Sequence, residues 1–212
     1  MRRTGRAAAV AALALAAAGC GGHAATHPAA APAAQQADAP ALHGLVPSPL
    51  PRKPSFTLTD TAGRPFDFAA QTRGKLTYLY FGYTHCPDAC PTAMTDLAYA
   101  VHSQPASVRH RVAVVFVTVD PRRDTRHVLR TWLDHYDRAF IGLTGSEAQV
   151  TAAERAAGIP VPPREAHTGT QYAVSHSSFV LPYSPDGVAH VVYAQGFRPA
   201  DYAHDLPLLL RY

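Results

Sequence analysis

The sequence contains few charged residues and only three cysteines, and both shortages narrow the range of functions. Charged residues make up 16% of the 212 residues and apolar residues 47%, which is ample for a packed core. No stripe of Lys or Arg with interleaved aromatic residues occurs. Without Arg2, Arg3 and Arg6, the formal net charge falls from +4 to +1. We therefore expect no nucleic-acid partner.

The sequence also lacks an apolar run long enough to cross a membrane. The run from Ala7 to Ala18 follows the N-terminal arginines and is shorter than the roughly 20 residues that a bilayer requires. This pattern predicts a signal peptide over residues 1–19. Its end, Ala17-Ala18-Gly19-Cys20, resembles the lipobox of bacterial lipoproteins, although Leu is usual where Ala17 stands. We expect Cys20 to be diacylated; a plain signal peptide is the alternative.

Residues 20–51 are rich in Ala and Pro and almost uncharged, which predicts a tether rather than a folded unit. The histidines on this segment are His23, His27 and His43, and we expect them to be solvated. Lipidation of Cys20 would leave Cys86 and Cys90 as the cysteines of the folded domain, which we place at residues 52–212.

The domain alternates strand and helix patterns. Strands are predicted at residues 56–60, 65–68, 76–81, 112–119, 140–143, 172–174, 178–183 and 188–194. Helices are predicted after Pro91, around residues 129–136, and over residues 146–157 and 202–210, with a long loop at 158–171. This order predicts an α/β fold in which helices cover both faces of a central sheet.

Cys86 and Cys90 lie where the buried strand at residues 76–81 passes into a helix. The helix dipole and the unpaired N–H groups at this position favour thiolate, so we expect a lowered thiol pKa. Their spacing puts the two sulfurs about one helical turn apart, within disulfide reach. A purely structural disulfide is one interpretation, although so short a loop would add little stability.

Two more polar clusters lie at the ends of predicted strands. Their position is relevant because ligand-binding sites in parallel sheets form at the carboxyl ends of strands. Asp120 follows one strand, and His176 precedes another. Two thiolates with the His176 imidazole suit copper, whereas structural zinc normally requires four ligands. His85 points differently from Cys86 in any regular backbone. A structural role for His176 and a turn-capping role for Asp120 remain open.

Three segments together resemble the Sco/SenC family of copper chaperones. They are FGYTHCPDACP at residues 81–91, VDPRRDT at residues 119–125 and the His176 segment, and the likeness runs from about Ser55 to Arg211. The resemblance implies a thioredoxin-like fold with a mixed sheet, a membrane tether, and copper, as Cu(I) or Cu(II), held by Cys86, Cys90 and His176. It also implies a role in assembling the Cu(A) centre of cytochrome c oxidase.

One departure from the family is Ser175, where many members carry Asp before the histidine. A contrast with thioredoxin-like reductases is the Cys-x-x-x-Cys spacing in place of Cys-x-x-Cys, which favours metal binding over dithiol exchange. Asp120 is the candidate for hydrogen bonding behind the ligands.

We therefore expect a metallochaperone, not an enzyme, that is lipid-anchored on the extracytoplasmic side of the cell membrane. Its partner would be apo subunit II of cytochrome c oxidase or another exported copper protein, with the long loop at 158–171 facing it. The alternatives are a thiol–disulfide oxidoreductase that cycles a Cys86–Cys90 disulfide, and a redox or copper sensor.

Overall fold

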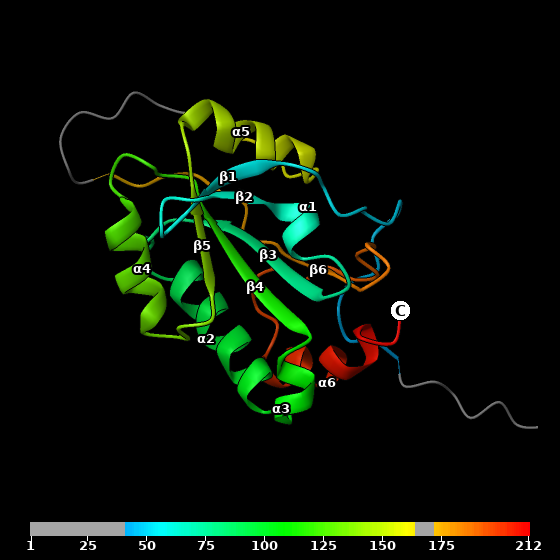
Figure 1. Ribbon diagram of the computed structural model, residues 1–212. Coiled ribbons are helices and arrows are strands. Elements are labelled where there is room, and N and C mark those ends of the chain that lie inside the picture. Colours follow the sequence, from blue (N-terminus) through cyan, green and yellow to red (C-terminus); the bar gives the residue numbers. More distant parts are fainter. Residues whose placement is uncertain (1–40, 164–171) are drawn as a thin grey trace, which may run out of the picture. The chain divides into compact units, whose positions relative to one another are not determined.

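The computed structural model describes residues 41–163 and 172–212, so the predicted signal peptide, Cys20, His23 and His27 lie outside the described residues. In the described part, six strands form one sheet in the order β2-β1-β5-β4-β3-β6 (Figure 1). The strands are β1 (Thr57–Asp60), β2 (Pro65–Asp67), β3 (Leu76–Gly82), β4 (Val112–Thr118), β5 (Ile141–Thr144) and β6 (Val180–Tyr183).

The sheet is mixed, as predicted. β3, β4 and β5 are parallel neighbours, while β6 pairs antiparallel with β3, and β1 pairs antiparallel with both β5 and β2. The carboxyl ends of β3 and β4 therefore meet the amino end of β6 at one edge of the sheet. Any residue just before β6 is carried to the same edge as the residues just after β3.

Helices cover both faces of the sheet, which confirms the predicted α/β architecture. α2, α3 and α6 lie on the opposite side of the sheet from α5 (Figure 1). The helices are α1 (Phe68–Gln71), α2 (Ala89–His102), α3 (Ala106–Arg109), α4 (Arg126–Asp134), α5 (Glu147–Ala156) and α6 (Pro199–Leu209). The short helices α1 and α3 were not predicted, because four residues are too few to show a helical period.

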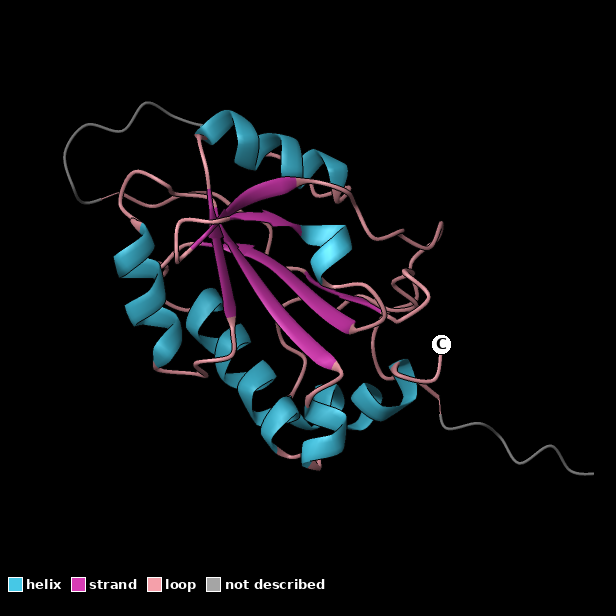
Figure 2. Ribbon diagram, in the orientation of Figure 1, coloured by secondary structure: helices cyan, strands magenta, loops and turns pink. Residues whose placement is uncertain are grey.

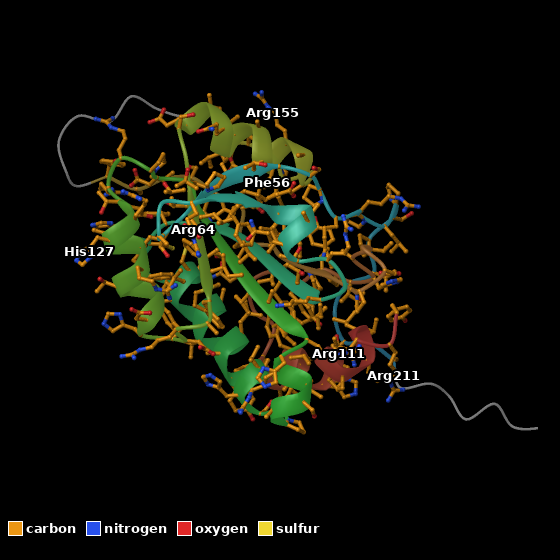
Figure 3. All side chains as sticks on the ribbon, viewed as in Figure 1. Phe56, Arg64, Arg111, His127, Arg155 and Arg211 are labelled. Atoms are coloured by element: carbon orange, nitrogen blue, oxygen red, sulfur yellow. The ribbon has the colours of Figure 1, made fainter. Side chains whose placement is uncertain are left out.

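The core lies on the two central strands. Every residue of β3 is buried, as is all of β4 except its first residue, which fits their nearly continuous apolar sequences. Figure 2 shows these strands in the middle of the molecule, flanked by helices. Polar side chains such as Arg155, Arg211 and His127 project outward at the periphery (Figure 3).

Side-chain caps explain where several helices begin. Ser146 forms a capping box with Gln149 at the start of α5, as expected from its sequence, and Thr125 caps α4. α2 begins at Ala89, two residues before Pro91 rather than after it. Proline is tolerated there because N–H groups in the first turn of a helix have no partner within the helix.

Two predicted strands are not regular strands. Residues 172–174 are irregular, and residues 188–194 form only isolated bridges, Tyr183 with Ala189 and Val180 with Tyr193. Val180 and Tyr183 are three positions apart, whereas their partners Tyr193 and Ala189 are four positions apart. The 188–194 segment therefore has one extra residue, which bulges out and interrupts the ladder. The same segment also forms bridges to Leu45 and Arg52.

The N-terminal end of the described chain is fastened to α6. The backbone N–H groups of His43 and Gly44 donate to the Asp205 carboxylate, at 2.9 and 3.0 Å. The His43 ring stacks on His204 at a centroid distance of 4.0 Å, and its Nδ1 lies 2.8 Å from Asp201. The His43 side chain is exposed, as predicted, at 43%, but it is held against α6 and does not lie on a free linker.

Asp205 offers a test of this attachment, because its fully buried carboxylate also accepts from the Tyr193 hydroxyl at 2.8 Å. We expect Asp205→Asn to lower the free energy of unfolding by about 2–4 kcal/mol, because buried donors lose a charged acceptor. Chemical denaturation measures this change. Asp134→Asn, at a side chain 41% exposed, is the control and should change it by less than about 0.5 kcal/mol. Equal effects would contradict the anchoring role of Asp205.

Candidate metal centre

The two cysteines lie where β3 passes into α2. Cys86 is in the turn between them, and Cys90 is the second residue of α2. The backbone N–H of Cys90 donates to Cys86 Sγ at 3.3 Å, so the first turn of the helix directs a donor at that sulfur. Both cysteines are free, as reversible binding or exchange at this position requires.

His176 reaches these sulfurs from the segment that enters β6. Because Val180 of β6 pairs with Tyr80 of β3, the four residues before Val180 lie beside the carboxyl end of β3. His176 Nε2 lies 3.6 Å from both Cys86 Sγ and Cys90 Sγ, and the three atoms all lie within 4.8 Å of one another. The predicted convergence of these three side chains is thus present in the structure.

The orientation of the His176 ring leaves the correct nitrogen facing the sulfurs. Nδ1 lies 3.0 Å from the carbonyl oxygen of Ser177, which only accepts, so Nδ1 carries the proton in the neutral ring. Nε2 then presents its lone pair to the two thiols. Tyr83 and Tyr80 pack edge-on against the ring at 5.4 and 6.3 Å between centroids, which fixes its plane.

The spacing of the three atoms fits one metal ion between them. Metal–sulfur bonds of about 2.3 Å and metal–nitrogen bonds of about 2.0–2.1 Å, as in zinc proteins, put sulfur and nitrogen about 3.6–3.8 Å apart on a shared ion. The 3.6 Å separations match this range. The donor set, two thiols and one imidazole, is the kind that selects soft first-row metals such as copper.

The two thiols occupy different environments. Cys90 is fully buried and Cys86 is 8% exposed, and burial raises the pKa of the Cys90 thiol above its ordinary value. The expected lowering of the thiol pKa is therefore wrong for Cys90, because desolvation outweighs the hydrogen bonds with Tyr83 and Tyr80 that would lower its pKa. A Cβ at Gly82 would lie 2.6 Å from Cys90 Sγ, so this sulfur packs where only glycine leaves room.

A buried carboxylate that sequence reasoning missed holds the turn of Cys86 in place. Asp124 is fully buried and accepts from the backbone N–H and the hydroxyl of Thr84, at 2.9 and 2.6 Å, and from the Thr118 hydroxyl at 2.6 Å. It therefore ties the turn after β3 to the end of β4. The sequence feature that could have pointed to Asp124 was its place in the VDPRRDT segment, just after β4. His85 lies beside it, 3.6 Å from the carboxylate, as expected for a side chain that points differently from Cys86.

Asp120 contacts other residues than the three candidate ligands. Its buried carboxylate accepts from the Tyr172 hydroxyl at 2.9 Å and from Arg123 Nε, and the Arg123 guanidinium stacks on the Tyr172 ring at 3.6 Å. Arg123 also lies over the Tyr83 ring, which packs on His176. We call Asp120, Arg123 and Tyr172 the Tyr172 cluster. It fastens the chain four residues before His176. Ser175 is exposed beside the histidine.

Two other features of the described residues do not share the geometry of this centre. The ligand atoms of His43, His204 and Asp205 lie within 4.8 Å of one another, but the two imidazole rings are nearly parallel at 9°. Both Nδ1 atoms already bond carboxylates, so the ring lone pairs do not converge.

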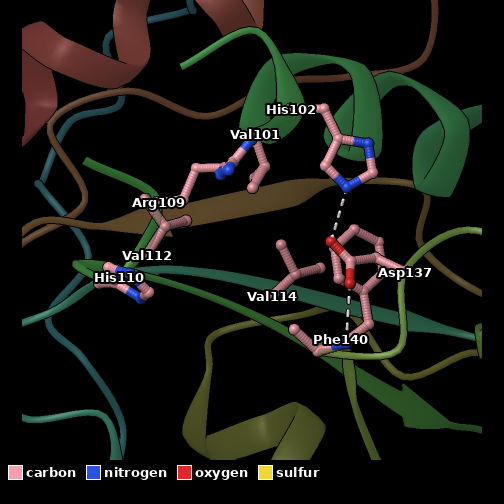
Figure 4. Close-up of a pocket in the computed structure, with 9 residues that line it drawn as sticks. Val101, His102, Arg109, His110, Val112, Val114, Asp137 and Phe140 are labelled. Atoms are coloured by element: carbon pink, nitrogen blue, oxygen red, sulfur yellow. Dashed lines mark hydrogen bonds and ion pairs between the residues drawn. The ribbon is translucent and has the colours of Figure 1, made fainter. Parts of the chain in front are cut away.

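A hollow of about 410 Å³ lies near the start of β4 (Figure 4). It is lined by Val101, His102, Arg109, His110, Val112, Val114, Asp137, Ala139 and Phe140.

In residues 41–163 and 172–212, no helix has both the length and the apolar character needed to cross a bilayer.

Comparison of the sequence with known proteins gives related chains. A putative copper-binding protein of Stutzerimonas stutzeri is 38% identical over 141 residues, which cover 65% of this chain and 68% of the relative. The mitochondrial protein SCO2 of Saccharomyces cerevisiae is 34% identical over 154 residues, which cover 72% of this chain. The matched part is 50% of the yeast protein, so this chain spans about half the length of that relative.

Solved structures share the fold. Copper-bound ScoI of Bradyrhizobium japonicum is 27% identical with a TM-score of 0.63, over 75% of this chain and 99% of that one. BsSco, a member of the Sco family of cytochrome c oxidase assembly proteins, is 20% identical with a TM-score of 0.59, over 78% of this chain and 98% of that one, a likeness of fold. The SCO1/SenC family model matches residues 48–211. The chain therefore belongs to the SCO1/SenC family, as its motifs predicted.

Proposed function

We propose that this protein is a copper chaperone that carries one copper ion between Cys86, Cys90 and His176. The observation that carries the proposal is the position of His176 Nε2, 3.6 Å from both sulfurs, with its lone pair turned toward them. Copper is the cargo, and the copper-binding relatives support this choice. Two soft thiolates and one imidazole suit Cu(I), which accepts few ligands.

Capture of the ion requires both thiols to lose their protons. Metal binding supplies the driving force for this deprotonation, because the thiolate is the form that binds the metal. The two protons pass to water. Burial disfavours the charged form of Cys90 in the empty protein. Loading therefore exchanges a neutral buried thiol for a thiolate paired with a cation, which offsets the desolvation cost.

Release is made possible by the incomplete coordination of the ion. Three protein ligands leave one side open to a ligand from the acceptor, and Cys86 is the sulfur nearer to solvent. His176 lies on an irregular segment, whereas the cysteines lie on a turn and a helix. Exchange of one ligand at a time then moves copper without free ion in solution.

The acceptor we propose is the Cu(A) site of apo cytochrome c oxidase subunit II, or another exported copper protein. The Sco family is associated with cytochrome c oxidase assembly, which supports this acceptor. We further propose residues 1–19 as signal peptide and the segment from Cys20 as a tether, whose last residues, from His43 to Pro51, are fastened to the copper-binding domain. Lipidation of Cys20 would then hold that domain at the extracytoplasmic face of the membrane, near a membrane-bound acceptor.

A second candidate function is reduction of the acceptor's cysteines. Cys86 and Cys90 are both free and their sulfurs lie within 4.8 Å of each other, close enough for small movements to form a disulfide. In this alternative His176 contributes little, because a dithiol exchange needs only the two sulfurs. Removal of the imidazole therefore distinguishes the two functions: it weakens copper binding in the first and changes little in the second.

Copper stoichiometry tests the proposed site. We expect the reduced protein to bind one copper per chain, Cys86→Ser or Cys90→Ser to weaken binding by more than about 100-fold, and His176→Ala to weaken it by about 10-fold or more. Competition with a chelator of known affinity measures these changes.

His85→Ala is the matched control, because His85 is adjacent to Cys86 and pairs with Asp124 instead. Copper binding unaffected by Cys86→Ser would disprove the site. A wild-type protein that binds no copper, yet cycles a disulfide at the same rate with or without His176, would favour the reductase.

The Tyr172 cluster provides a second test, because it fastens the chain beside His176. We expect Tyr172→Phe, which removes the hydrogen bond to Asp120 and keeps the ring, to weaken copper binding by about 10-fold. The thiolate-to-Cu(II) absorption should also shift toward that of His176→Ala, since loss of the histidine ligand is the cause.

The control is Tyr99→Phe, at an exposed tyrosine on α2, which should leave affinity and spectrum unchanged. A Tyr172→Phe protein with lower thermal stability but a wild-type copper spectrum would show that the cluster supports the fold alone.

A further inference from the structure

A short loop near the start of the described chain protrudes from the domain. Its two ends form bridges to the segment after β6, Leu45 with Val192 and Arg52 with Val188. Seven positions separate Leu45 from Arg52, whereas four separate Val192 from Val188. The loop therefore has three residues more than the segment beside it, and these bulge outward. We call residues 45–52 the projecting loop.

The projecting loop exposes apolar side chains. Six large apolar side chains are exposed among residues 41–163 and 172–212, and three of them, Leu45, Val46 and Leu50, are on this loop, with Val46 at 73%. A fourth, Tyr212, stacks on His190 of the adjoining segment. Exposed apolar side chains gathered in one place mark a binding surface. Three prolines restrict the loop and so reduce the entropy that it loses on binding: Pro47, Pro49 and Pro51.

Basic residues surround the projecting loop. Lys53, the next residue, donates to the carbonyl oxygens of Thr72 and Lys75, at 3.0 and 3.4 Å. The carbonyl oxygen of Arg111 accepts from the first N–H of β3 at 3.0 Å, and its guanidinium donates to the Leu210 carbonyl at 3.1 Å. These contacts bring five exposed basic residues, two of them labelled in Figure 3, to this end of the domain: Arg52, Arg73, Lys75, Arg111 and Arg211. Asp186 lies beside them and already pairs with His190 at 2.9 Å.

This end of the domain is opposite the candidate metal centre. Lys75 and Arg111 come directly before β3 and β4, whereas Cys86 and Cys90 follow β3, and His176 precedes its antiparallel neighbour β6. β3 has seven residues, so about 20 Å of strand separates the two ends. A partner bound at the projecting loop therefore leaves the cysteines accessible.

Charge and chain order indicate which partner fits this surface. Apolar side chains ringed by Lys and Arg match a bilayer with anionic headgroups, because the apolar groups enter the acyl boundary and the cations face the phosphates. The loop is also the first part of the domain after the proposed tether from Cys20, and so the part held nearest to the lipid. A second copy of the chain fits less well, since two such surfaces would bring like charges together.

We propose that the projecting loop and the basic residues around it bind an anionic lipid surface and turn the candidate metal centre away from the bilayer. This inference rests on the proposed lipid tether and goes beyond it, because a flexible tether alone leaves the orientation of the domain open. Contact through this surface selects the orientation in which an acceptor approaches Cys86 and Cys90 from the aqueous side.

Tryptophan fluorescence tests this orientation, because Trp132 is the only tryptophan in the sequence. In a Trp132→Phe background, Val46→Trp reports the loop, and Phe179→Trp reports the metal-centre end, where Phe179 is 39% exposed. The full-length protein is extracted from membranes and reconstituted without copper in vesicles whose acyl chains carry bromine, which quenches tryptophan on close contact. We expect phosphatidylglycerol vesicles to quench Val46→Trp at least about threefold more than Phe179→Trp.

Charge variants test the basic residues. Replacing three of them should reduce the quenching of Val46→Trp by about half or more, because fewer cations face the headgroups. The three substitutions are Arg73→Gln, Lys75→Gln and Arg211→Gln. A matched control removes three exposed arginines elsewhere and should change the quenching by less than about a tenth, since salt screens distant charges. It consists of Arg126→Gln, Arg138→Gln and Arg155→Gln.

Equal quenching of the two reporters would overturn the proposal, as would equal quenching of Val46→Trp in phosphatidylcholine and phosphatidylglycerol vesicles. A blue shift of Val46→Trp fluorescence that grows with protein concentration in the absence of vesicles would assign the loop to a second copy instead. Flotation with phosphatidylcholine vesicles reports the tether separately. A protein that floats with anionic vesicles alone would overturn the lipid anchor and still support the surface, and the copper-free protein makes every outcome independent of the proposed cargo.

Discussion

The antiparallel pairing of β6 with β3 is the constraint on which the candidate centre depends. His176 lies 86 residues beyond Cys90 in sequence, and this pairing brings them to one edge of the sheet. If β6 ran parallel to β3, the residues before it would lie at the opposite end. The mixed sheet, and not the cysteine spacing alone, therefore makes a three-residue centre possible.

The centre combines a rigid part with a part held by side chains. Backbone hydrogen bonds fix the cysteines on a turn and a helix, and Asp124 ties that turn to β4. His176 is placed instead by β6 on one side and by Tyr172 on the other. The proposed carrier function would use this difference, because ligands that are all rigid would hold the ion too firmly to pass it on.

The sequence predicted the parts that local pattern encodes. Apolar runs located β3 and β4, and the three motifs identified Cys86, Cys90 and His176. It did not predict the raised pKa of Cys90, because desolvation depends on what packs around the sulfur. The roles of Asp124, Arg123 and Tyr172 were missed for a similar reason, since they come from contacts across the fold. Asp120 was named as a support of the ligands, but it contacts Arg123 and Tyr172 instead. The bulge after β6 also has no signal in the alternation of residues 188–194.

The Tyr172 cluster has a consequence for how this chain tolerates change in length. Tyr172 and Val180 bound the short segment that bears His176, and each is fastened independently to the sheet edge. We therefore expect residues inserted or deleted before Tyr172 to leave the histidine in place at the sheet edge. The position of His176 is thus set separately from the length of the chain that leads to it.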